Sequence, residues 1–214
     1  MDHADFSSAA YWEQRYRAGG HSGAGSYGRL AAFKADFLNA LISFNAITSA
    51  IEFGCGDGNQ LAQLDIPDYV GLDIAPAAIA RCRQRFAGQP GRDFRHMDDR
   101  AGLAAAELAL SLDVIYHLVE DDVFDDYMQA LFNHAWRFVV IYASDLDAEW
   151  PSRHVRHRRF TAHVAQHFPD WQRAAVVPNI YPYDPAQPDE TSFAAFHVYR
   201  QPAEACRITV PAVP

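Results

Sequence analysis

Three glycines at alternate positions, Gly54, Gly56 and Gly58, constrain the fold of this chain more than any other feature. They follow a short apolar run, residues 50–53, and precede a helix-compatible segment, residues 59–64. Glycine readily adopts positive φ, and it lets a ligand approach where a Cβ atom would clash. The pattern therefore predicts a strand that turns sharply into a helix, whose first backbone N–H groups face a ligand.

Apolar segments alternate with helical patterns after this turn. Strands are expected at residues 69–73, 93–97, 108–113 and 138–142, and helices at residues 77–87 and 121–134. Strands that are apolar throughout and alternate with helices indicate a parallel sheet covered on both faces. A helix is expected at residues 160–168. Residues 171–177 and 193–199 then predict two strands joined by a proline-rich loop, which suggests an antiparallel edge to the sheet.

The region before the glycine turn predicts two helices joined by a flexible loop. Residues 6–17 place Tyr11, Trp12, Arg15 and Tyr16 on roughly one helical face, and a second amphipathic helix runs to about residue 44. The five glycines within residues 18–28 predict a loop that lies over a ligand or, alternatively, a mobile linker. Residues 1–200 are expected to form one domain, with residues 1–45 as N-terminal helices and lid, and residues 201–214 to form a flexible tail.

Composition narrows the class of protein. The 214 residues carry a formal net charge of −9, which argues against nucleic acid or an anionic membrane as the partner. The three cysteines are scattered and lack metal-ligand spacing, which suggests reduced thiols. No secretory signal is apparent, and no window approaches the ~20 apolar residues of a membrane span. These features predict a cytoplasmic protein.

Acidic residues around the glycine turn distinguish between two classes of ligand. A dinucleotide site has Gly-x-Gly-x-x-Gly spacing, whereas this turn has Gly-x-Gly-x-Gly with Glu52 before it and Asp57 inside it. A carboxylate within the turn is expected to repel a pyrophosphate and to attract a cationic group. Asp73 ends the next strand, where an acid accepts hydrogen bonds from a ribose. A ligand with a ribose, an ammonium group and no phosphate fits these charges, as S-adenosylmethionine does.

Three segments resemble the motifs of the class I S-adenosylmethionine-dependent methyltransferases. They are residues 51–59 (IEFGCGDGN), 71–73 (GLD) and 110–118 (LSLDVIYHL), and the resemblance covers most of residues 46–144. The chain is similar in particular to bacterial methyltransferase-domain proteins that act on small molecules. The resemblance implies a Rossmann-like three-layer α/β sandwich, with a seven-stranded, mostly parallel sheet whose last strand is antiparallel. It also implies that the N-terminal helices and the glycine-rich loop form a lid.

The same resemblance implies which residues bind the cofactor. They are Glu52, Gly54, Cys55, Gly56, Asp73, Ile74, Asp98, Asp99, Leu112 and Tyr27. Asp73 would hold the ribose, and Ile74 would pack against the adenine. Asp98, or the adjacent Asp99, would lie near the adenine amino group, and Leu112 beside the methyl group.

His117 is the leading candidate for a catalytic base. It follows the fourth strand at the carboxyl edge of the sheet, where ligands bind, and an unperturbed imidazole titrates near neutral pH. The alternative is a packing histidine that orients a loop. Asp113 and Asp145 follow two adjacent strands, as the Mg²⁺ ligands of catechol-type methyltransferases do. No Asn follows Asp145, so no metal is expected.

A basic cluster, residues 154–159, stands out in an acidic chain. Its His154, Arg156 and Arg158 are candidates for binding an acceptor that carries a carboxylate or phosphate, because Arg binds both groups bidentately. A solvated approach to the next helix is the simpler interpretation. Tyr116, and Tyr181 on the proline-rich loop, are further candidates for lining the acceptor pocket, although such tyrosines more often anchor loops.

The sequence as a whole predicts methyl transfer from S-adenosylmethionine to a small polar molecule, with S-adenosylhomocysteine as the product. Oxygen is the favoured acceptor atom, and nitrogen and sulfur stay open. The alternative is a non-catalytic S-adenosylmethionine-binding protein or a partner subunit with the same fold. Neither the acceptor nor the oligomeric state is predicted, because loop shape rather than a motif sets the acceptor.

Overall fold

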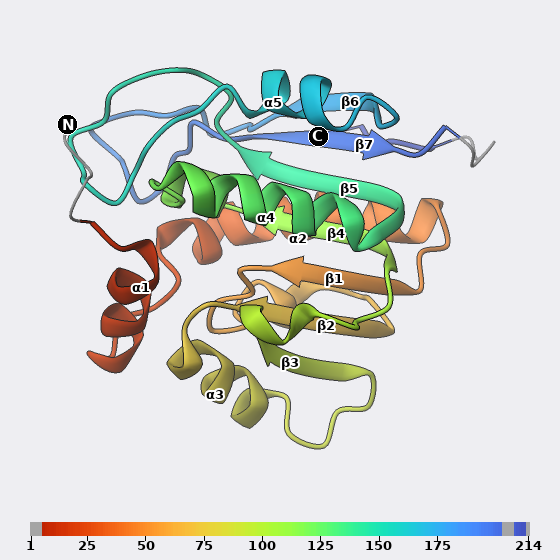
Figure 1. Ribbon diagram of the computed structural model, residues 1–214, viewed down its shortest axis with the longest axis horizontal. Helices are drawn as coiled ribbons and strands as arrows, with labels where there is room; N and C mark the ends of the chain where they lie inside the picture. Colours follow the sequence, from red (N-terminus) through yellow and green to blue (C-terminus); the bar gives the residue numbers. More distant parts are fainter. Residues whose placement is uncertain (1–5, 203–207, 213–214) are drawn as a thin grey trace.

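The strands of the computed structural model, which describes residues 6–202 and 208–212, pair in the order β3-β2-β1-β4-β5-β7-β6 (Figure 1). The parallel strands are β1 (Ser49–Phe53), β2 (Asp68–Asp73), β3 (Arg92–His96), β4 (Ala106–Leu112) and β5 (Ala135–Ala143). β7 (Ala195–Arg200) is antiparallel to both β5 and β6 (Gln172–Pro178). This confirms the predicted seven-stranded, mostly parallel sheet whose last strand in the chain is antiparallel, and that strand, β7, lies between β5 and the edge strand β6.

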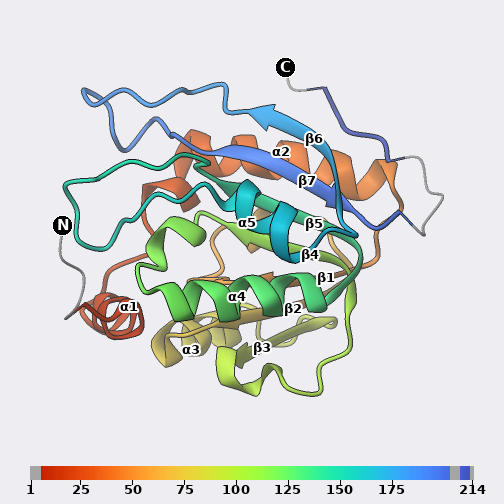
Figure 2. The same cartoon turned by 45° about the horizontal axis from the view of Figure 1, so that its top comes forward.

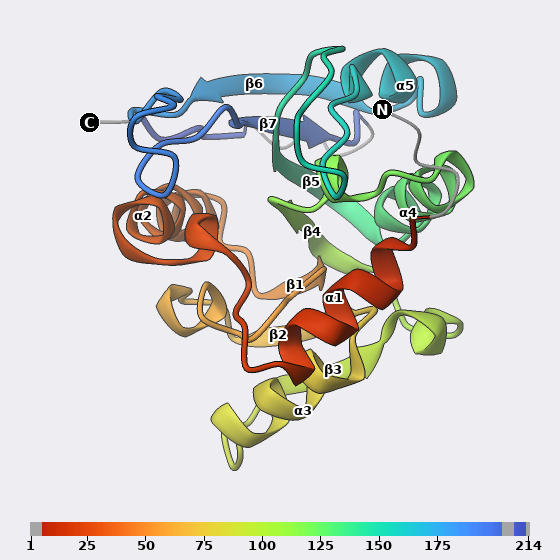
Figure 3. The same ribbon diagram turned by 90° about the vertical axis from the view of Figure 1, so that its left-hand side faces the viewer.

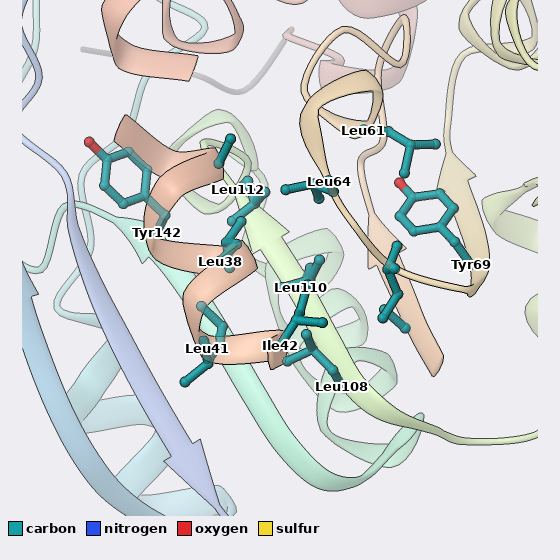
Figure 4. Close-up of a cluster of buried hydrophobic side chains, with 14 of the residues drawn as sticks. Leu38, Leu41, Ile42, Leu61, Leu64, Tyr69, Leu108, Leu110, Leu112 and Tyr142 are labelled. Carbon is teal, nitrogen blue, oxygen red and sulfur yellow. The ribbon is translucent and has the colours of Figure 1, made fainter. Parts of the chain in front are cut away.

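Helices cover both faces of the sheet, which confirms the three-layer sandwich (Figures 2 and 3). α2 (Gly28–Phe44) and α3 (Pro76–Arg85) pack with one apolar cluster, and α4 (Asp121–Asn133) and α5 (Phe160–His167) pack with the other. In Figure 4 the buried side chains of Leu38, Leu41 and Ile42 on α2 lie beside Leu108 and Leu110 of β4. The apolar spacing along α2 thus fixes that helix against the centre of the sheet.

α1 (Ser8–Arg17) lies across the carboxyl ends of the parallel strands (Figure 3). Ser7 caps the helix, since its hydroxyl accepts a hydrogen bond from the backbone N–H of Ala10. Glu120 accepts hydrogen bonds from the backbone N–H and the hydroxyl of Ser8, at the first turn of α1. At the last turn, the Arg81 guanidinium donates to the carbonyls of Tyr16 and Gly20. The negative charge of Glu120 thus lies at the N-terminus of α1 and the positive charge of Arg81 at its C-terminus, which is the arrangement that the helix dipole favours.

One predicted helix is only a short turn. The segment after the glycines, residues 59–64, forms a single 3-10 turn, Leu61–Gln63, rather than an α-helix. Pro67 disfavours helical geometry in the residue before it, so the segment has no room for a second turn. The Asn59 side chain binds outside this segment, because its amide donates a hydrogen bond of 2.7 Å to the Ser26 carbonyl of the glycine-rich loop. Short 3-10 turns also occur at Ala24–Ser26, Met97–Arg100 and Ile115–His117.

Part of the C-terminal segment packs against the domain. The Asn45 side chain exchanges hydrogen bonds with the backbone of Thr209 at 3.0 and 3.1 Å, and Ile208 and Val210 pack against the apolar cluster beneath α2. The predicted tail therefore makes specific contacts at residues 208–210, while residues 203–207 and 213–214 lie outside the described residues. Among the residues that the structure describes, no helix is both long and apolar enough to cross a membrane.

Candidate active site

A cavity of about 450 Å³ lies between the carboxyl ends of β1, β2 and β4 and the overlying α1. Its size is that of a small-ligand site. Nine of the predicted site residues line it: Glu52, Gly54, Cys55, Gly56, Asp73, Ile74, Asp98, Leu112 and His117. The other seven do not: Asp99, Tyr27, Tyr116, His154, Arg156, Arg158 and Tyr181. The structure thus brings together the residues of the glycine turn and of the strand ends.

The glycine turn uses its own backbone donors within the protein. Gly54, Gly56 and Gly58 have φ values of +84°, +58° and +74°, which side-chain-bearing residues rarely adopt. The N–H groups of Gly54 and Cys55 donate to the Leu72 carbonyl. The next N–H groups donate to the Asp73 carboxylate, the Ser22 hydroxyl, the Cys55 carbonyl and the Asp57 carboxylate in turn. This turn therefore has no ring of free donors for a pyrophosphate, which favours a phosphate-free ligand.

Two carboxylates that line the cavity are buried. Burial raises the pKa of Asp73 to about 6, although hydrogen bonds from the N–H groups of Ala75 and Gly56, both 2.9 Å, oppose the shift. Burial likewise raises the pKa of Glu52 to about 7, against the effect of a hydrogen bond from the Tyr69 hydroxyl. Each carboxylate has unused lone pairs beside the cavity. The pair is suited to accept hydrogen bonds from ribose hydroxyls and an ammonium group.

The raised pKa values of Asp73 and Glu52 predict pH-dependent cofactor binding. The affinity for S-adenosylhomocysteine, measured by titration calorimetry, should increase about tenfold between pH 5.5 and 7.5, because only ionised carboxylates accept both sets of hydrogen bonds. In the free protein the native state holds these protons more tightly than the unfolded chain. Its free energy of unfolding should therefore fall as the pH rises from about 4 to about 7.

A control for the pH prediction is a pair of variants that cannot ionise. Glu52→Gln with Asp73→Asn should bind weakly at every pH between 5.5 and 7.5, with a flat profile. A wild-type protein whose affinity does not change over this range would contradict the prediction.

Asp57 holds the glycine-rich loop rather than the ligand. Its carboxylate accepts hydrogen bonds from the N–H of Ser22 at 3.1 Å and from the Tyr27 hydroxyl at 2.8 Å. Burial alone would raise the pKa of Asp57. The hydrogen bonds from Ser22 and Tyr27, together with one from the backbone N–H of Asn59, outweigh burial and hold the pKa of Asp57 below its usual value. Asp57 was expected to attract a cationic ligand, but it does not line the cavity, and its carboxylate faces the glycine-rich loop instead. Tyr27, a predicted cofactor residue, serves the same contact between the glycine-rich loop and the glycine turn.

Asp113, at the end of β4, is held by two donors. Its carboxylate accepts a hydrogen bond of 2.5 Å from the Lys34 ammonium and one of 2.7 Å from the Tyr116 hydroxyl. Its φ of +61° is unusual for a residue with a side chain. Asp113 lines the cavity, whereas Tyr116 is buried behind it, so Tyr116 acts through Asp113 rather than by facing the cavity itself.

His117 lines the cavity as a neutral imidazole. Its Nδ1 lies 2.9 Å from the His154 carbonyl, which places the ring proton on Nδ1 and leaves a lone pair on Nε2. Burial lowers the pKa of His117 to about 4, although the contact with the His154 carbonyl opposes the shift. The Trp12 ring of α1 makes an edge contact with the imidazole at 4.9 Å between centroids. The geometry suits a hydrogen-bond acceptor more than a strong base.

The two arginines that were predicted to bind the methyl acceptor instead bind the protein itself, around the start of α4. Arg158 donates to Asp121 at 2.5 Å and Arg156 donates to the Val119 carbonyl at 2.7 Å. Both guanidinium groups lie within 4 Å of the Asp121 carboxylate, which sits at the first turn of α4. His154 stacks on Tyr11 of α1, with centroids 4.7 Å apart. These contacts support a role in holding the loop before α4, away from the cavity.

Tyr181 and the two candidate metal ligands also have other partners. The Tyr181 ring lies under the Arg29 guanidinium at 4.4 Å and packs against the apolar cluster of α2. Asp145 accepts hydrogen bonds from the N–H and hydroxyl of Thr161, at the start of α5, whereas Asp113 is paired with Lys34. Within residues 6–202 and 208–212, no three His, Cys, Asp or Glu side chains are grouped so that they could hold a metal ion.

Several residues that line the cavity were not predicted from the sequence. They are Trp12, Tyr16, Ser22, Ser26, Gln60 and Met97. The first four belong to α1 and the glycine-rich loop, whose resemblance to a lid was the only signal available. Gln60 follows the glycine turn, and its amide donates to the Ala31 carbonyl at 3.1 Å. Spacing along the sequence gives no indication of such a contact.

Comparisons with known proteins agree with this geometry. Residues 51–146 match the model of a methyltransferase domain family. No curated protein sequence matches the chain. Among solved structures, the N-methyltransferase NodS from Bradyrhizobium japonicum WM9, in complex with S-adenosylhomocysteine, is 14% identical with a TM-score of 0.66, over 91% of this chain and 98% of NodS.

Two further solved structures show the same fold. The magnesium protoporphyrin IX methyltransferase ChlM from Synechocystis PCC 6803, with bound S-adenosylhomocysteine, is 14% identical with a TM-score of 0.64, over 90% of this chain and 97% of ChlM. An S-adenosylmethionine-dependent methyltransferase from Anabaena variabilis ATCC 29413 is 16% identical with a TM-score of 0.67, over 92% and 96%. The methyltransferase-domain match over residues 51–146, the shared fold and the cavity together support a class I S-adenosylmethionine-dependent methyltransferase.

Proposed function

We propose that this enzyme transfers the methyl group of S-adenosylmethionine to a hydroxyl oxygen of a small polar molecule in the cytoplasm. The observation that carries the proposal is that Asp113 and His117 both line the cavity. A carboxylate and a neutral imidazole both accept hydrogen bonds, so together they suit an acceptor that presents an O–H group. Methyl transfer from a sulfonium mainly requires that the acceptor is positioned and that its proton is accepted.

The charge around the cavity supports an uncharged acceptor group. Glu52, Asp73, Asp113 and Glu120 line the wall, and the lining arginine, Arg100, is paired with Asp126, while Arg156 and Arg158 are bound to Asp121 and loop carbonyls. An acceptor that carries a carboxylate or phosphate would meet mostly like charges there. We therefore favour a neutral hydroxyl compound over an anionic one.

The proposal is tested by incubating the protein with ¹³C-methyl-labelled S-adenosylmethionine and fractionated cell metabolites. A labelled product is expected, and the chemical shift of its methyl carbon identifies an oxygen, nitrogen or sulfur acceptor. NodS is named an N-methyltransferase, so the identity of the atom is a real choice within this fold. A protein that binds S-adenosylhomocysteine but labels nothing across all fractions would favour the non-catalytic alternative.

His117→Ala is expected to lower kcat for the labelled product at least tenfold, because the acceptor loses a hydrogen-bond partner beside the methyl group. The affinity for S-adenosylhomocysteine should change less than threefold, as measured by calorimetry. His163→Ala is the matched control, since His163 lies on α5 and does not line the cavity. Equal turnover in both variants would show that His117 only packs against its neighbours.

A further inference from the structure

Lys34 is a fully buried lysine with a single short ionic contact. Its side chain has 0% exposure, and its ammonium lies 2.5 Å from Oδ2 of Asp113. The ammonium also lies 5.3 Å from the centre of the Tyr142 ring, and Figure 4 shows Tyr142 beside α2. A buried charge is costly unless a partner compensates it. The site therefore retains a full ion pair where apolar side chains could fill the space.

The pair is arranged so that only its negative member faces the cavity. Asp113 lines the cavity and its side chain keeps 11% exposure, whereas Lys34 does not line it. On the lid side, a Cβ atom added to Gly25 would lie 2.6 Å from Oδ2 of Asp113, so the glycine-rich loop closes directly over the carboxylate. The Lys34 ammonium thus sits behind Asp113 as seen from the cavity.

The order of the strands places Asp113 at the reactive end of the cofactor. β1 lies between β2 and β4, with Glu52 paired to Leu110. Asp73 of β2 suits the ribose, and the glycine turn after β1 suits the methionine part. The next position along this edge is the end of β4, where a Cβ atom added to Gly54 would lie 2.5 Å from Cγ2 of Val114. The sulfonium and its methyl group are therefore expected near Asp113.

Charge distinguishes donor from product at this end of the ligand. S-adenosylmethionine carries a positive sulfonium, whereas S-adenosylhomocysteine has a neutral thioether at the same position. An uncompensated carboxylate nearby would attract the donor and leave the product unaffected. The cation behind Asp113 reduces that attraction.

We propose that Lys34, by balancing the charge of Asp113, sets how strongly the site prefers the charged donor over the uncharged product. Lys34 is then a specificity-determining residue that acts through Asp113 and touches neither ligand. The inference rests on the cofactor and not on the identity of the acceptor, so it holds for the enzyme whichever molecule is methylated.

The test measures Kd for S-adenosylmethionine and for S-adenosylhomocysteine by calorimetry and takes the ratio of product Kd to donor Kd. Lys34→Met should raise the ratio about tenfold, because it leaves Asp113 uncompensated. Asp113→Asn should lower it about tenfold, because it leaves the ammonium alone. The double variant, Lys34→Met with Asp113→Asn, has no net charge and should return within threefold of the wild-type ratio.

The ratio separates this role from simple bracing of α2 against β4. A pair that only braces would weaken both ligands equally when it is broken, so the same ratio in all four proteins would overturn the proposal. If Lys34→Met does not fold, Asp113→Asn and the double variant still decide, because the first must lower the ratio and the second must restore it. Failure to label any acceptor would affect the proposed function alone.

Discussion

Replacing Gly54 with alanine is expected to lower the affinity for S-adenosylhomocysteine at least about a hundredfold, equivalent to roughly 3 kcal/mol. Gly54 has a φ of +84°, and an added Cβ would lie 2.5 Å from Cγ2 of Val114. The clash requires the Val114 side chain, the turn or the segment after β4 to move, and all three line the cavity. Titration calorimetry measures the affinity, and urea denaturation measures the accompanying loss of stability.

Gly102→Ala is the matched control for this variant. Gly102 has the same φ of +84°, but an added Cβ would meet nothing within 4 Å. It should lose about 1–2 kcal/mol of stability from backbone strain alone and bind S-adenosylhomocysteine normally. If both variants bind equally well, then close packing at Gly54 does not shape the site.

Replacing Phe196 with alanine is expected to lower the free energy of unfolding by about 3–5 kcal/mol. The side chain is fully buried on β7, and its ring lies 4.2 Å from Phe37 and 4.6 Å from Tyr142, measured between centroids. The antiparallel strand is thereby joined to α2. Urea denaturation followed by far-ultraviolet circular dichroism measures the change.

Phe44→Ala provides the comparison for the same substitution on the surface. Phe44 ends α2 with 59% of its surface exposed, so its loss should cost less than about 0.5 kcal/mol. A small effect at Phe196, similar to that at Phe44, would mean that the core around β7 is not closely packed.

Features that depend on neighbours in the sequence were predictable. A few consecutive residues encode each of these features: the strands around the glycine turn, the acid at the end of β2, and the acidic residues in the first turn of α4. The fold followed because parallel strands with buried faces bring their carboxyl ends to one edge. That placement was sufficient to collect nine predicted residues around one cavity.

Features that depend on distant partners were not predictable. A lysine in an amphipathic helix normally extends into solvent, and nothing near Lys34 indicates Asp113, 79 residues later. Asp57 was assigned to the ligand, but its partners Ser22 and Tyr27 lie on a loop that composition alone could not place. The ion pair between Arg158 and Asp121, which lies 37 residues earlier, was likewise not predictable from the sequence.

The anchoring of α1 at both ends has a consequence for the order of events during synthesis. Residues 8–28 leave the ribosome before any strand of the sheet, yet their docking partners are Asp57, Arg81 and Glu120, which are made later. Since domains are synthesised from the N-terminus, α1 and the glycine-rich loop must wait, solvated, until α3 and the segment before α4 have formed. Residues 8–28 are therefore made before their partners and reach their native place after them, and the cavity stays open to its cofactor until then.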